Sequence, residues 1–361
     1  MIRKTIIIIL ITTLITGCWN YIEINNLVLI SGIGIDYQNN KYEVSFETLY
    51  QDKESSDSNF EKGIIKTGTG KTLGEAFDNI TLSIEKEPYF AHLKVLVIST
   101  EIANNHLDKI FDFFLRNNDI RNIFSIVIAN ENKPVEILSK SDNYFPVASE
   151  KIKSLLENNV YSNYISKNKY FKKVASNYLS KDQNISLTSI KLENNNLKLD
   201  DLIIFDSQKP VGKLDTNKSL ILSVIDNKEP RSLFSINYPN NKTITIRIYK
   251  SKTNIKISKK EFIIENNLMA ELVENSLNIN LENNINQEKI TKDFINKINN
   301  DTYNLINYLK ENNSDVIGIN NKYYRKYKKK NNSYFENTKY KVKTKLNINK
   351  KGLIFEVKND N

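Results

Sequence analysis

The sequence predicts a protein of mixed α and β structure in three portions, preceded by a short export segment. Removing residues 1–17 leaves 344 of the 361 residues, which is long for a single hydrophobic core and indicates two or three domains. Apolar and alternating patterns typical of strands are interleaved with stretches of helical spacing. With 40% hydrophobic and 26% charged residues, the composition is that of a globular protein.

The export segment ends at Cys18, the only cysteine of the chain. Arg3 and Lys4 precede an apolar stretch over residues 5–16, and the small residue Gly17 comes directly before the thiol. This order is typical of a secretory signal peptide. A cysteine at the first position after the expected cut resembles the lipobox of bacterial lipoproteins, in which the thiol receives a diacylglyceryl group and becomes the new N-terminus.

Two other interpretations of this segment stay open, an ordinary buried thiol and an uncleaved membrane anchor. About 12 apolar residues span roughly 18 Å as a helix, whereas a hydrocarbon core is about 30 Å thick. The sequence therefore favours lipidation of Cys18. Because two acyl chains hold a protein stably on a membrane, we expect a soluble body on a permanent tether.

The first portion, residues 18–145, predicts an α/β layer domain. A buried strand over residues 27–36 and an alternating strand over 42–50 are joined by the turn residues Asn39 and Asn40. In the second strand Val44 and Phe46 share one face, and Glu43, Ser45 and Glu47 share the other. A helix over 72–86, a buried strand over 94–99, a helix over 107–115 and a buried strand over 123–129 follow.

A polar stretch over residues 139–146 leads into a small middle domain, residues 146–214. It predicts two short helices and a hairpin of strands 187–192 and 197–205. The last domain, residues 215–361, predicts a strand around Ile246, a long helix over 287–312 and a final strand over 340–348. The pattern over 261–279 fits a helix or a strand. Lysines alternate along the final strand, as natural sheets use them to prevent edge pairing.

The charge of the chain is +10 at neutral pH. Export makes nucleic acid a poor partner, and a tether makes anionic lipid a natural neighbour. Residues 322–330 concentrate this charge, with tyrosines between the basic side chains. A solvated loop or helix end is the favoured interpretation, and contact with anionic lipid headgroups is the alternative.

The sequence motifs predict no catalytic, cofactor-binding or metal-binding residues. The Gly-Thr-Gly-Lys-Thr string at 68–72 lacks the glycine that a phosphate-binding loop needs at Ile65, so it predicts a turn between a strand and a helix. Gly32 and Gly34 lack a third glycine at Tyr37 and predict a place where another element crosses a strand. The two histidines, His92 and His106, have no partners at metal-ligand spacing.

The residues after Cys18 resemble the Ger(x)C family, the C subunits of spore germinant receptors. The resemblance begins with Cys-Trp-Asn at 18–20, Asn-Asn-Leu at 25–27 and Ser-Gly-Ile-Gly-Ile-Asp at 31–36. Further matching blocks lie at 68–72, 89–95, 113–116, 212–214 and 315–318. The family usually has aspartate where Asn20 stands, and tends to carry tryptophans near the C-terminus, where this chain has residues such as Tyr334.

The resemblance implies the fold class α+β, with three domains that are each a mostly antiparallel or mixed β-sheet flanked by helices. It implies a non-enzymatic lipoprotein, anchored through Cys18 on the outer face of the spore inner membrane. The implied partners are the integral-membrane A and B subunits of a receptor for nutrients such as amino acids. It also favours a strand over 261–279. The alternative, a solute-binding lipoprotein of a transporter, would have two lobes around a polar cleft.

Overall fold

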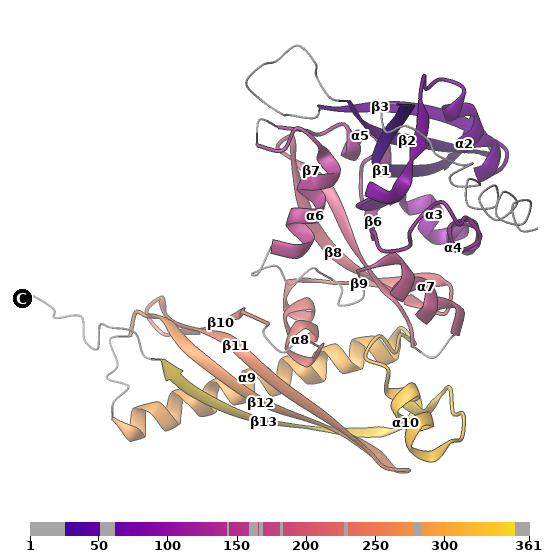
Figure 1. The fold of residues 1–361 in the computed structure, drawn as a ribbon. Helices are drawn as coiled ribbons and strands as arrows, with labels where there is room; N and C mark the ends of the chain where they lie inside the picture. Colours follow the sequence, from indigo (N-terminus) through magenta and orange to yellow (C-terminus); the bar gives the residue numbers. More distant parts are fainter. Residues whose placement is uncertain are drawn as a thin grey trace, which may run out of the picture.

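The computed structural model describes residues 26–50, 62–142, 144–158, 165, 169–180, 183–226, 230–277 and 283–350. Residues 1–17 and Cys18 lie outside this part of the chain. The described residues form two mixed β-sheets, each flanked by helices (Figure 1). This confirms the predicted α+β class.

The larger sheet, here called sheet A, has the strand order β3-β2-β1-β5-β6-β7-β8-β9, with β4 also paired to β1. Its strands are β1 (Leu27–Gln38), β2 (Lys41–Tyr50), β3 (Lys62–Gly70), β4 (Glu87–Tyr89), β5 (Val95–Ser99), β6 (Ser125–Ala129), β7 (Ser186–Glu193), β8 (Asn196–Asp206) and β9 (Lys209–Leu214). The central strands β1, β5, β6 and β7 are parallel, and antiparallel strands flank them on both sides. The predicted hairpins over residues 27–50 and 187–205 are therefore confirmed.

Helices cover both faces of sheet A. They are α2 (Leu73–Thr81), η2 (Phe90–His92), α3 (Thr100–Asn105), α4 (Leu107–Arg116), α5 (Pro134–Leu138), α6 (Ala148–Asn158) and α7 (Phe171–Ser180). Alternate residues of β5 enter different cores: Leu96 and Ile98 pack with α2, α3, α4 and α7 in the first core. Val95 and Val97 pack with α5 and α6 in the second core. A strand buried on both faces has a continuous apolar sequence, and the buried strand predicted over residues 94–99 is confirmed.

Helix α5 crosses β1 at the two glycines that the sequence singled out. A Cβ atom on Gly32 would lie 2.9 Å from Leu138 Cδ2, and one on Gly34 would lie 3.1 Å from Pro134 Cβ. The prediction that another element crosses this strand is confirmed. The glycines serve close packing and not dinucleotide binding.

Glu47 was expected on the polar face of β2, yet its side chain is buried at 1% exposure. Its carboxylate accepts hydrogen bonds from the backbone N–H of Ala148 at 2.6 Å and of Ser149 at 3.0 Å, and from Ser31 Oγ at 2.9 Å. The first N–H groups of a helix have no partner within it, and a carboxylate at this end is favoured by the helix dipole. Glu47 therefore fixes the start of α6 on β2, although burial raises the pKa of this carboxyl.

The Gly-Thr-Gly-Lys-Thr string is the predicted turn from β3 into α2. The side chain of Thr72 accepts from the Glu75 N–H at 3.2 Å, and Glu75 Oε2 accepts from the Lys71 N–H at 2.7 Å. These bonds satisfy the free donors at the helix start. The predicted end of this helix at residue 86 was wrong, because α2 stops at Thr81 and Ser83 Oγ bonds the carbonyl of Ile80 at 2.7 Å.

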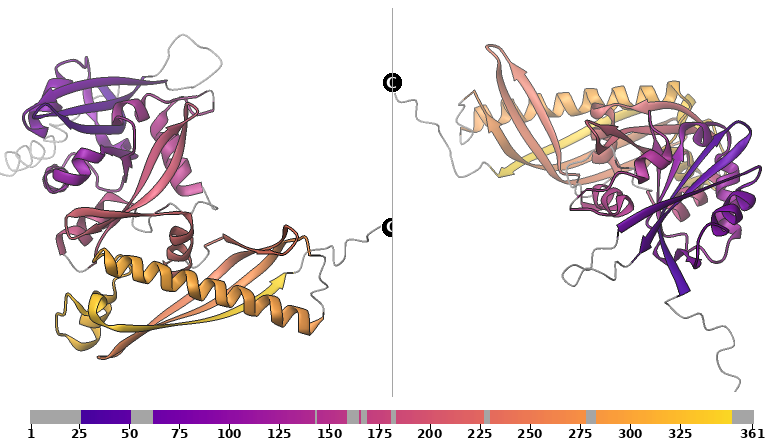
Figure 2. Two further views of the ribbon diagram at one scale, coloured as in Figure 1. Left: turned by 180° about the vertical axis from the view of Figure 1, so that it is seen from behind. Right: turned by 90° about the horizontal axis from the view of Figure 1, so that it is seen from above.

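The smaller sheet, here called sheet B, has the order β10-β11-β12-β13. Its elements are α8 (Thr216–Asp226), β10 (Ser232–Tyr238), β11 (Lys242–Ile257), β12 (Glu261–Asn275), α9 (Asn284–Glu311), α10 (Ile319–Tyr327), α11 (Tyr334–Asn337) and β13 (Lys339–Lys350). The long helix α9 lies across one face of the sheet (Figure 2). The segment 261–279, whose pattern fitted a helix or a strand, contains strand β12. The lysine-rich β13 is an edge strand with Lys341, Lys343 and Lys345 exposed.

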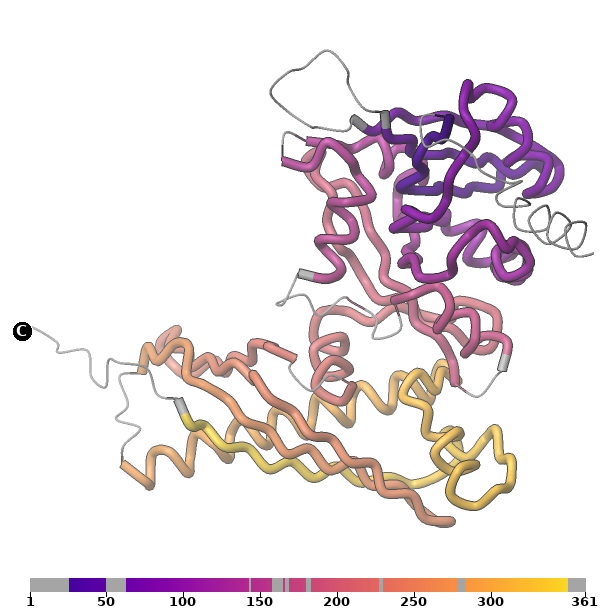
Figure 3. Tube along the Cα trace, in the orientation of Figure 1, coloured from indigo at the N-terminus to yellow at the C-terminus, as the bar shows by residue number. Residues whose placement is uncertain are grey.

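The two sheets share a third core. Leu202, Ile204 and Leu214 of sheet A pack with the residues that α9 and sheet B bury, and the chain trace passes from β9 through α8 into sheet B (Figure 3). Sheet A itself runs across the boundary expected at residue 145, because β7 pairs with β6 through Val127 and Thr188. The division into residues 18–145, 146–214 and 215–361 stays a prediction.

The glycines of the turn before α2 give a test of packing. A Cβ atom on Gly68 would lie 2.7 Å from the carbonyl oxygen of Ala76 and 2.9 Å from the backbone N of Ile80. Because a helix backbone cannot yield as a side chain can, we expect Gly68→Ala to lower the free energy of unfolding by about 1–3 kcal/mol in urea titrations.

Gly74→Ala is the control at a neighbouring glycine, in the first turn of α2. The nearest atom to its new Cβ would be Thr72 Oγ1 at 4.0 Å, so the change should stabilise α2 by up to about 1 kcal/mol through helix propensity. Equal stability of the two variants would contradict this account of Gly68.

Candidate functional site

Cys18, the one site residue predicted from the sequence, lies outside the described residues. Within the described ranges, no group of three or more His, Cys, Asp or Glu side chains is arranged to hold a metal ion. Across that same part of the chain, no helix has the length and apolar character to cross a membrane. The ring of His106 packs on that of Tyr37 with centroids 4.0 Å apart, and His92 lines a cavity described below.

A hydrogen-bonded junction joins sheet A to the end of α9. The carbonyl oxygen of Phe205 accepts from Asn184 Nδ2 at 2.9 Å and from Ser314 Oγ at 2.7 Å. The backbone N–H of Asn184 donates to the Asp315 carbonyl at 3.3 Å. Gln183 Nε2 donates to the Val316 carbonyl. We call these residues, with the segment 313–318, the junction.

Asp315 is the buried carboxylate of the junction, at 3% exposure. It accepts from the backbone N–H of Ile319 at 2.8 Å and of Asn320 at 2.7 Å, the first two residues of α10. Gly318, directly before the helix, has a φ of +78°, a conformation that favours glycine. Burial raises the pKa of Asp315 to about 6 despite the backbone hydrogen bonds, and the nearby carboxylate of Glu336 adds to the shift.

The basic segment 322–330 forms most of α10 and the residues after it. Tyr323 is buried, and Lys326 Nζ donates to the Ile257 carbonyl, which ties the helix to β11. Lys328 ends the helix in a left-handed conformation with a φ of +54°. Part of this segment is therefore structural, while the exposed Lys330 lines a polar cavity of about 320 Å³ that Asp315 also lines.

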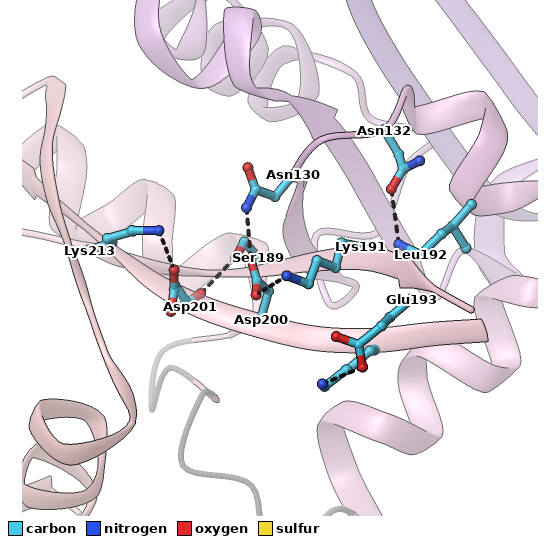
Figure 4. Close-up of polar contacts among 10 residues, drawn as sticks. Asn130, Asn132, Ser189, Lys191, Leu192, Glu193, Asp200, Asp201 and Lys213 are labelled. Carbon is cyan, nitrogen blue, oxygen red and sulfur yellow. Dashed lines mark hydrogen bonds and ion pairs between the residues drawn. The ribbon is translucent and has the colours of Figure 1, made fainter. Parts of the chain in front are cut away.

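A polar network lies on β7, β8 and β9 (Figure 4). Asp200 accepts from Asn130 Nδ2 at 2.7 Å and pairs with Lys191 at 3.1 Å. Asp201 pairs with Lys213 at 2.9 Å. Burial acts to raise the pKa of Asp200, but the hydrogen bonds from Asn130 and Lys191 outweigh it and the pKa is lowered. Asp200 therefore stays ionised at neutral pH, and the two ion pairs brace the strands.

Asn132 and Ser189 extend the network along the backbone. Asn132 Oδ1 accepts from the Leu192 N–H at 2.9 Å, and Ser189 Oγ donates to the Asp201 carbonyl at 2.9 Å. Glu193 pairs with Lys198 across the hairpin at 2.5 Å. No sequence motif indicates this network, because its members are ordinary polar residues that strand pairing and the segment after β6 bring together.

A cavity of about 770 Å³ opens where β5 and β6 begin. Its walls come from η2 and the residues after it, the start of β6, the end of α6 and the start of α7. Among the lining side chains are Lys153, Tyr170, Lys172 and Lys173. No pattern in the sequence indicated it, since four distant segments contribute.

Comparisons with known proteins identify the family. A model described as "Spore germination protein N-terminal domain" matches residues 20–192. A second, described as "Spore germination B3/ GerAC like, C-terminal", matches residues 200–352. Together they span most of the chain and both sheets.

Three relatives come from Bacillus subtilis (strain 168). Spore germination protein B3 is 26% identical, and the match covers 66% of this chain and 65% of that protein. Spore germination protein KC is 24% identical over 44% and 41% of the two chains. Spore germination protein A3 is 25% identical over 73% and 72%. The chain thus covers less than two thirds of the length of the first two.

One solved structure, the crystal structure of the GerBC protein, has a similar fold. It covers 88% of this chain and 96% of its own, with a TM-score of 0.53 and 18% identity. At this identity the likeness shows the fold, and it supports the arrangement of both sheets.

The junction carboxylate gives a pH test. The pKa of Asp315 is about 6 in the folded chain and 3.8 in its ordinary state, so between these values the folded state binds more protons than the unfolded state. Stability from this group therefore falls as the pH rises from about 4 to about 6. Between pH 4.5 and 7 this group should lower the free energy of unfolding by about 2 kcal/mol, and Asp315→Asn should remove that change, as measured by urea unfolding across this range.

Asp112→Asn, which removes an exposed carboxylate from α4, is the control for the loss of one charge. It should leave the pH dependence of the free energy of unfolding as in the unmodified chain. If Asp315→Asn kept the full pH dependence, the titration would belong to another group.

Proposed function

The chain belongs to the Ger(x)C family of spore germination proteins, and on that premise we propose that it is a lipid-anchored, non-enzymatic subunit of a spore germinant receptor. The observation that carries the proposal is the pair of family models, which match residues 20–192 and 200–352. The first match begins two residues after Cys18, so the matched body would follow directly on the lipidated residue.

The proposed tether places sheet A close to the membrane. About nine residues separate Cys18 from Leu27, where β1 begins. An extended chain of that length reaches about 30 Å. Confinement within this distance raises the effective concentration of the body toward membrane partners without any new contact.

We propose that these partners are the integral-membrane A and B subunits, on the outer face of the spore inner membrane. Nutrient-triggered germination would then need this chain as a scaffold and not as a catalyst.

Co-purification from spore membranes tests the proposal. The full chain, tagged at its C-terminus, is solubilised in detergent, and we expect polytopic germination subunits to elute with it. Elution without any polytopic partner would count against a receptor. Elution with the membrane subunits of a transporter would instead favour the solute-binding alternative.

Cys18→Ala gives a second, independent prediction. Without the thiol no diacylglyceryl group can be attached, so we expect the precursor to stay uncleaved or to be mislocalised. Spores that carry it should respond poorly to nutrients. Fractionation with immunoblotting reports processing and location, and loss of optical density reports germination.

Asn20→Asp is the matched control, because it changes a neighbouring residue to the one usual in the family and keeps the thiol. It should be processed and retained normally. A Cys18→Ala chain that is cleaved and held on the membrane would refute lipidation at this residue.

A further inference from the structure

The cavity at the start of β5 and β6 has the dimensions of a ligand site. Its volume of about 770 Å³ lies within the range of about 300–1,000 Å³ common for small-molecule pockets. Leu93 contributes from the segment between η2 and β5, Ser125 from β6, Lys153 and Glu157 from α6, and Lys172 from α7. Several rigid elements thus meet around one space, which no role described above uses.

Part of the lining is apolar and uncovered. Ile123 is 65% exposed and Tyr170 is 43% exposed, and both line the cavity together with Ala91. Large apolar side chains that gather at a hollow and stay exposed mark binding surfaces. The apolar lining favours a ligand with a hydrophobic body.

The charged lining is mainly positive. Lys94 is paired with Glu150, and Lys153 lies 4.0 Å from Glu157, the one acidic residue of the lining. Lys172 and Lys173 are exposed on α7, and no carboxylate of the described residues lies within ion-pair distance of them. These two ammonium groups favour a ligand with an acidic group.

Asn122 adds a hydrogen-bond acceptor to the same wall. Its Oδ1 atom is buried and has no hydrogen-bond partner among the described residues. A buried polar atom without a partner is destabilising, and a donor on a ligand would satisfy it. The neighbouring backbone is fixed, since the Asn122 carbonyl accepts from the Lys172 N–H at 3.3 Å.

We propose that this cavity binds an organic anion that combines an acidic head, an apolar body and a hydrogen-bond donor. Lys172 and Lys173 hold the head, and Ile123 and Tyr170 contact the body. The anion is a free small molecule or the headgroup of an acidic lipid, which share this chemistry. The inference goes beyond the proposed receptor role and is independent of Cys18.

Two fluorescent probes test the site in the chain from residue 18 onward with Cys18→Ser. All three cores lie within residues 28–348, so this chain retains every core residue. The anionic probe is 8-anilino-1-naphthalenesulfonate. The neutral probe is N-phenyl-1-naphthylamine, which keeps the aromatic body and the N–H but lacks the sulfonate. We expect saturable binding of the anionic probe at one site.

Lys172→Gln combined with Lys173→Gln should lower the affinity for the anionic probe by about fivefold to thirtyfold. The affinity for the neutral probe should change by less than about twofold. Lys343→Gln with Lys345→Gln removes two exposed lysines of β13 and is the matched control, which should change neither probe. Ser176→Trp places a bulky ring in the lining from the exposed face of α7 and should weaken both probes.

Unchanged binding of the anionic probe in the double lysine variant, or unsaturable binding, would overturn the proposal. Vesicles of phosphatidylglycerol and phosphatidylcholine then separate the two sources of the anion. Vesicle binding that falls in the same variant supports a lipid headgroup. Vesicle binding that stays constant while the soluble probe is lost supports a free small molecule. None of these readouts depends on receptor partners, so failure here leaves the proposed function standing.

Discussion

Strand β8 is the element on which the arrangement of the whole chain depends, because its side chains enter all three cores. Leu197 and Leu199 pack in the second core, beneath α5 and α6. Leu202 and Ile204 pack in the third core, with sheet B, and Phe205 packs in the first core. Main-chain pairing with β7 and β9 fixes the register of these residues. Because well-packed cores resist displacement, one strand sets how sheet B sits on sheet A.

Two buried carboxylates, in different parts of the chain, each accept hydrogen bonds from the start of a helix. Glu47 accepts from the first N–H groups of α6, and Asp315 accepts from those of α10. Burial raises the pKa of both groups, so each is destabilised as an ion at neutral pH. Apolar side chains of similar size would avoid this penalty but would leave buried N–H donors unpaired. The carboxylates therefore specify where two helices begin, at some expense in stability.

Most of the secondary structure was predictable from local sequence patterns. Contacts between segments far apart in the sequence were not. Strand β5 is buried at every position from Val95 to Ser99, and its continuous apolar run made it predictable from its residues alone. The pairing of Val127 with Thr188 joins segments 61 residues apart and leaves no local signal. Glu47 has the alternation of a solvated face, yet the start of helix α6, about 100 residues later, packs against its carboxylate. The lining of the cavity was equally hidden, since Asn122 and Lys172 come from separate segments.

Helix α7 links the cavity to the junction. Its exposed side places Lys172, Lys173 and Ser176 in the cavity lining. Its opposite side places Val174 and Tyr178 in the first core, where the Tyr178 ring lies 4.7 Å from that of Phe111. Shortly after its end, Gln183 and Asn184 hold the segment that follows α9. A displacement of α7 would therefore disturb the first core, the cavity wall and the junction together. The packing that keeps this helix in place thus keeps the cavity and the orientation of sheet B in a fixed relation.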